Sequence, residues 1–86
     1  MRAHTKAFDL AVRLAVAAGT RARVRCRREG GFLVEAAVPG DLGDEAHGAV
    51  LAVLAGADRY GHRYTDAAQA VWAELDEEDE EWEQPG

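Results

Sequence analysis

Charged residues recur every three or four positions near the start of the chain, which is the period of a helix with one solvent face. The charged positions are Arg2, Lys6, Asp9 and Arg13, and the apolar residues on the other side of the helix are Ala7, Phe8, Ala11, Leu14 and Ala15. Gly19 follows, and glycine is typical of a helix end. The pattern predicts an amphipathic helix over residues 3–18.

The next segment alternates with a period of two, which predicts a β-hairpin over residues 20–38. Its first strand has a basic face and an apolar face, formed by Arg21, Arg23, Arg25 and Arg27 and by Ala22, Val24 and Cys26. Phe32, Val34, Ala36 and Val38 share one face of the second strand. A three-residue loop of Glu29, Gly30 and Gly31 aligns the apolar faces, because a one-residue slip would invert every side chain. This register pairs Cys26 with Val34, sets Arg25 opposite Glu35, and points Cys26 inward.

The stretch Ala46–Ala57 contains no Lys, Arg, Asp or Glu. We expect a buried helix there, capped by Asp41 or Asp44 and too short to span a bilayer at ~1.5 Å per residue. On a helical wheel one broad face holds Ala46, Val50, Val53, Leu54 and Ala57. The opposite side carries a small-residue strip, Gly48, Ala52 and Gly56, where another backbone could approach closely. Either another helix of the chain or a second copy of the protein could cover this strip.

After a connector over residues 58–64, Asp66 and Gln69 have the spacing of a capping box, with Thr65 as a rival cap. Ala68, Val71, Trp72 and Leu75 then form an apolar stripe that predicts a third helix. The expected fold is a single small α+β domain over residues 1–75, in the order α-β-β-α-α. Its two-stranded antiparallel sheet packs on the helices, and residues 76–86 form an acidic tail or an extension of the last helix.

Charge is distributed unevenly over the 86 residues, whose net charge is −6. Residues 1–28 carry eight bases and one acid, whereas residues 74–83 carry eight acids and no base. The two ends are therefore expected to attract each other, within one molecule or between molecules.

The sequence offers no constellation of residues for catalysis. One cysteine excludes an internal disulfide, the three histidines lack metal-ligand spacing, and there is no phosphate-binding glycine loop. We expect a non-enzymatic protein with no metal and no cofactor. Because the N-terminus has no long apolar run, a cytoplasmic location is the default. No family is recognised.

The arginine ladder, Arg21, Arg23, Arg25 and Arg27, is the most specific feature of the sequence. Its spacing of ~6.6–7 Å is close to that of successive phosphates in a nucleic acid. Three interpretations stay open: contact with a polyanion, docking of the acidic tail or an acidic partner, or a solvated face that protects a strand edge. A second candidate surface for partner binding consists of Tyr60, His62, Arg63, Tyr64 and Trp82.

The favoured function is that of a small interaction or regulatory protein that acts through protein–protein contacts. Large apolar residues are few, and obligate dimerisation is a common remedy for a small core, so a homodimer with an unidentified protein partner is expected. The alternative is a nucleic-acid-binding accessory protein that uses the basic hairpin face and is gated by the acidic tail. A membrane partner is not expected.

Overall fold

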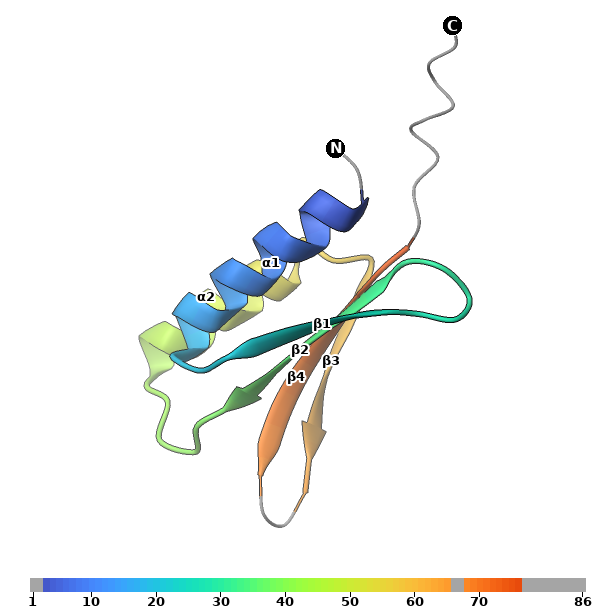
Figure 1. Cartoon of the computed structure of the whole chain (residues 1–86). Helices are drawn as coiled ribbons and strands as arrows, with labels where there is room; N and C mark the ends of the chain where they lie inside the picture. Colours follow the sequence, from blue (N-terminus) through green and yellow to red (C-terminus); the bar gives the residue numbers. More distant parts are fainter. Residues whose placement is uncertain (1–2, 66–67, 77–86) are drawn as a thin grey trace, which may run out of the picture.

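The computed structural model describes residues 3–65 and 68–76, with secondary structure in the order α-β-β-α-β-β. The elements are α1 (Ala3–Ala18), β1 (Ala22–Cys26), β2 (Phe32–Val38), α2 (Asp44–Leu54), β3 (Arg59–Tyr64) and β4 (Gln69–Leu75). The strands form one antiparallel sheet in the order β1-β2-β4-β3. Figure 1 shows α1 and α2 side by side on one face of that sheet. The α+β class is as expected, but the two-stranded sheet and the order α-β-β-α-α are wrong.

The first helix is confirmed. Ala7, Ala11 and Leu14 are buried, as their helical spacing predicts, and Leu10, which was not assigned to that face, is buried with them. Phe8 was expected on the same face but is 52% exposed. Gly19 ends the helix with a φ of 71°, a left-handed conformation that glycine adopts without strain. The backbone N–H groups of Gly19 and Thr20 both donate to the carbonyl oxygen of Ala15, at 2.8 and 3.2 Å, which satisfies an acceptor at the helix end.

The hairpin is confirmed, but its expected register is wrong by two residues. Val24 pairs with Val34 and Arg25 with Leu33, so Arg25 is not opposite Glu35. The turn is closed between Arg27 and Gly31, whose backbone N–H and carbonyl groups lie 3.0 Å apart. The loop therefore has three residues, as expected, but starts one residue earlier and places Gly30 at the positive φ of 105°. Because the shift is an even number of residues, every side chain keeps its expected face.

The central helix is buried only on the face that the helical wheel predicts, and not all round as expected. Val50 and Leu54 are buried, whereas Gly48, Ala52 and Gly56 are exposed, and none of the described elements covers that strip. The expected caps are wrong: Gly43 is the N-cap, in an extended conformation and without a side-chain cap bond. Asp44 lies instead inside the first turn, where a carboxylate interacts favourably with the helix dipole.

The expected third helix is wrong, because its residues form β4 and the supposed connector forms β3. Val71, Ala73 and Leu75 are buried while the residues between them are only half-buried, which is the period of a strand. The second strand of the first hairpin would otherwise be an open edge, and β4 pairs with it over seven residues. Thr65 does not cap a helix: its hydroxyl accepts from the N–H of Ala68 at 2.9 Å, in the β3–β4 connection. Asp66 lies outside the described residues.

The core lies between the sheet and the two helices. Strands β2 and β3 are parallel, with β4 between them, so β2, α2 and β3 form a split β-α-β unit. The buried residues come from both layers: Ala7, Leu10, Ala11, Leu14, Ala18, Val34, Ala36, Val38, Val50, Leu54, Val71, Ala73 and Leu75. No described element covers the opposite face of the sheet, which is called the open face below.

On the open face the indole of Trp72 lies over Gly61, its neighbour across β4 and β3. A Cβ at position 61 would lie 2.5 Å from Trp72 Cζ2. We expect Gly61→Ala to displace the indole and to lower the free energy of unfolding by ~1–3 kcal/mol, the usual cost of overpacking. Gly48→Ala is the matched control, because nothing lies within 4 Å of a Cβ there and alanine favours a helix. Urea denaturation and tryptophan emission measure both effects; equal stability of the two variants would contradict the packing described.

Candidate binding surfaces

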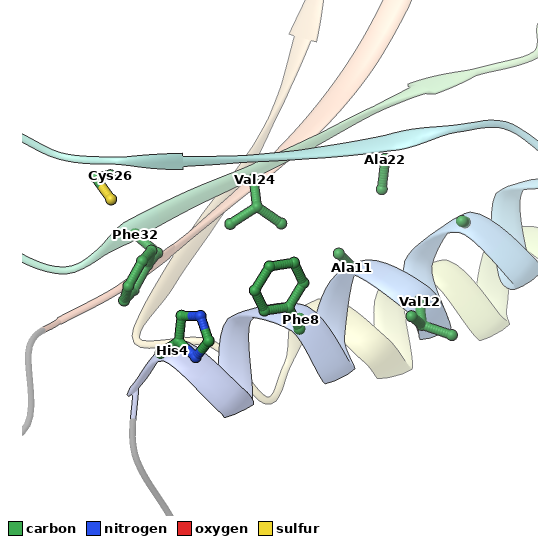
Figure 2. Close-up of a pocket in the computed structure, with 9 residues that line it drawn as sticks. His4, Phe8, Ala11, Val12, Ala22, Val24, Cys26 and Phe32 are labelled. Atoms are coloured by element: carbon green, nitrogen blue, oxygen red, sulfur yellow. The ribbon is translucent and has the colours of Figure 1, made fainter.

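An apolar groove of about 530 Å³ runs between α1 and the edge strand β1. Figure 2 shows Val24 of β1 pointing towards Phe8 of α1, with Phe32 near His4 at one end of the groove. Phe8, Val12 and Val16 follow one another at intervals of four along α1 and are 52%, 63% and 77% exposed. An exposed apolar stripe beside an apolar groove is typical of a surface that another chain covers.

The groove is bordered by the outer edge of β1, which has no neighbouring strand among the described residues. The backbone N–H and carbonyl groups on this edge can pair with an added strand. Cys26 lies on the groove side of β1, as its alternation predicts, but it is exposed because the edge strand has no outer neighbour there. Cys26 therefore points inward as expected but is not shielded, and it is an accessible chemical probe of the groove.

The other side of β1 carries the arginine ladder onto the open face. Two arginines that the sequence analysis did not assign to this surface, Arg59 and Arg63 of β3, lie on the same face, as does Trp72 of β4. This grouping was not predicted, because Trp72 was expected on a helix. The strand period of the residues 69–75 was the signal that could have revealed it.

Carboxylates of the sheet pair with several of these arginines. Glu35, only 14% exposed, lies 3.2 Å from Arg25 and 3.3 Å from Arg63. Arg21 and Arg23 have no ion pair within the described part of the chain and line a hollow of about 530 Å³, together with several alanines and with the paired side chains of Glu35 and Arg63. Arg21 and Arg23 are therefore the arginines of the ladder that can bind a further anion.

A second cluster of charges lies at the end of β4. Arg59 donates to both Glu74 and Asp76, and Arg27 lies 3.5 Å from Asp76. The hydrogen bond from Arg59 is the main cause that lowers the pKa of Asp76, and the same contact raises the pKa of Arg59. The pKa of Glu29 is lowered mainly by a backbone hydrogen bond and then by the charge of Arg27. The first residue of the acidic tail is thus fixed to the sheet.

The second predicted surface is only partly assembled. The rings of His62 and Tyr64 stack with their centroids 4.2 Å apart, and Tyr60 and Tyr64 are 48% and 68% exposed. Arg63 points to the opposite face, towards Glu35. Trp82 lies outside the described residues. The structure therefore brings together the β3 aromatics but separates them from Arg63.

His47 and His62, far apart in sequence, line the same hollow of about 100 Å³ between α2 and β3. The Nε2 atom of His62 is buried without a hydrogen-bond partner. No group of three potential metal ligands occurs in residues 3–65 and 68–76, and no described helix is long and apolar enough to cross a membrane. In comparisons with protein-family models, curated proteins and solved structures, nothing matches this chain.

Proposed function

We propose that this protein is a small, non-enzymatic interaction protein that acts through protein–protein contacts as a homodimer. Its contact surface is the groove between α1 and β1. The observation that carries the proposal is the exposed apolar stripe of Phe8, Val12 and Val16 beside that groove. Covering such a stripe removes apolar area from water, which stabilises the complex by roughly 25 cal/mol for each Å² of apolar surface buried.

The small-residue strip of α2 is the competing contact surface, because Gly48, Ala52 and Gly56 are exposed as well. The strip offers close backbone approach but little apolar area, whereas the groove offers three large side chains together with an open strand edge. Since buried apolar area is the main driving force for association, the groove is the stronger candidate.

One charge placed on each surface tests the proposal. Val12→Glu and Ala52→Glu both introduce a carboxylate at an exposed helical position, so neither should unfold the domain. We expect the intact chain to sediment at about twice its 9.3 kDa at micromolar concentration, and Val12→Glu alone to sediment as a monomer. A monomeric intact chain, or a Val12→Glu variant that still dimerises, would refute the role of the groove.

A second function, binding of single-stranded nucleic acid, is favoured by one observation. The sheet groups Trp72 with the arginines on an open face, and aromatic side chains on a basic surface are what stacked bases and phosphates require. Within the described residues the bases and acids number nine each, so the net charge of −6 comes from residues outside that part.

A further inference from the structure

We infer that the groove and edge of β1 receive the acidic tail of a second copy, with Trp82 in the groove and Glu81 and Glu83 against Arg23 and Arg25. The inference rests on the proposed function, since it names what fills the same groove. The occupant adds a strand to β1, so its side chains alternate between the apolar groove and the arginine face.

Direct pairing of two β1 strands is disfavoured by charge. Residues that face each other across a strand pair share one face of the sheet, so an arginine of one copy must meet an arginine of the other. If two β1 strands pair antiparallel with Val24 on the two-fold axis, Arg23 lies opposite Arg25 of the second copy. A shift of this register by two residues only changes which arginines lie opposite each other. Like charges directly opposite each other are destabilising. The ladder therefore excludes a second β1 from this edge and selects an acidic strand.

The tail has the complementary pattern. The triplet Glu81-Trp82-Glu83 has an apolar residue between two acids, and Arg23-Val24-Arg25 of β1 has an apolar residue between two bases. Opposite Val24, the indole of Trp82 would enter the groove beside Phe8, while both carboxylates would reach the arginine face. This match holds for either direction of the added strand.

The reach of the chain decides between the molecule's own tail and that of a second copy. Asp76 lies beside Arg27 at the end of β4, which is the third strand of the sheet counted from the β1 edge. To lie outside β1 opposite Arg25, the chain must cross three strand spacings of ~4.8 Å and two residues of strand, a straight distance of ~16 Å. The five steps from Asp76 to Glu81 span at most ~17 Å when fully extended. That straight line runs through β2 and β1, so the chain has to go around these strands, and the tail of the same molecule is too short for the longer path.

Disulfide trapping in the intact chain tests the register. With Trp82 opposite Val24, position 80 faces Cys26 in an antiparallel arrangement and position 84 faces it in a parallel one. We expect Glu80→Cys or Gln84→Cys to give a disulfide-linked dimer under mild oxidation, because paired strands bring Cα atoms within bonding range. Glu83→Cys is the control, since its thiol would face the arginines. Equal cross-linking of all three variants, or only bonds within single chains, would overturn the inference.

A second measurement separates this inference from the function on which it rests. Labelling of Cys26 by a thiol reagent should slow as the concentration of intact protein rises, and Trp82→Ala should abolish that protection and the dimer together. If Val12→Glu gives monomers but Trp82→Ala still dimerises, the groove remains the interface and the tail is not its occupant. If neither variant changes sedimentation, the proposed function fails as well.

Discussion

Leu54→Ala should remove a large part of the stability of this domain. Leu54 is 1% exposed at the end of α2 and belongs to the core formed with the sheet. Truncation of a buried leucine costs ~2–5 kcal/mol, because transfer energy is lost and a cavity remains. An 86-residue domain has a free energy of unfolding of only roughly 4–13 kcal/mol. Urea denaturation should therefore show a much lower midpoint, or a chain that is partly unfolded without denaturant.

Leu51→Ala is the matched control on the same helix. Leu51 is 46% exposed, so the same chemical change should alter the free energy of unfolding by no more than ~0.5 kcal/mol. Equal losses in the two variants would mean that the exposed side of α2 is covered in solution. That outcome would move the dimer contact from the groove to the strip of Gly48, Ala52 and Gly56.

Local periodicity was sufficient for the first two-thirds of the fold. The positions of α1, the first hairpin and the inward face of α2 follow from short-range patterns, and even the wrong hairpin register preserved the faces of both strands. The exact loop could not be deduced, because Gly30 and Gly31 both tolerate a positive φ and two adjacent three-residue loops keep the same faces aligned.

The prediction for the last third of the fold failed because its apolar stripe, over residues 68–75, fits both a helix and a strand. Val71 and Leu75 are four apart, which suits one face of a helix, but they are also an even number of residues apart, which suits one face of a strand. Long-range pairing decides between these readings: β4 lies between β2 and β3 and satisfies backbone groups on both sides. The period of two over residues 69–75 allowed a strand but did not select it over a helix, so the grouping of Trp72 with the arginines on the open face was missed.

Removing residues 77–86 should unmask binding of single-stranded nucleic acid, if the open face is a phosphate site. The deletion keeps Asp76, which pairs with Arg27 and Arg59 in the sheet, and removes six acids, so the net charge changes from −6 to 0. The six acids are Glu77, Glu78, Asp79, Glu80, Glu81 and Glu83. A polyanion then no longer competes with the carboxylates of the tail for the arginines.

The truncated protein has Trp72 as its only tryptophan, so its emission reports directly on the open face. We expect a single-stranded oligonucleotide to quench it, with an affinity that falls steeply as salt rises. We expect Trp72→Ala to weaken binding roughly 5- to 150-fold, the equivalent of ~1–3 kcal/mol of stacking. Because this variant has no tryptophan, its binding is measured by the fluorescence anisotropy of a labelled oligonucleotide.

Two arginine variants distinguish contacts with phosphates at a defined site from a general effect of net charge on binding. Arg23→Gln on the open face should reduce the slope of log affinity against log salt by ~0.7, the contribution of one phosphate contact on a single strand. Arg13→Gln changes the net charge equally but lies on α1, paired with Asp9 at 3.3 Å, so it should leave the slope unchanged. If the truncated protein ignores DNA and RNA at low salt, the ladder is not a phosphate site. Its arginines would then act only at the strand edge, where they keep two copies of β1 apart.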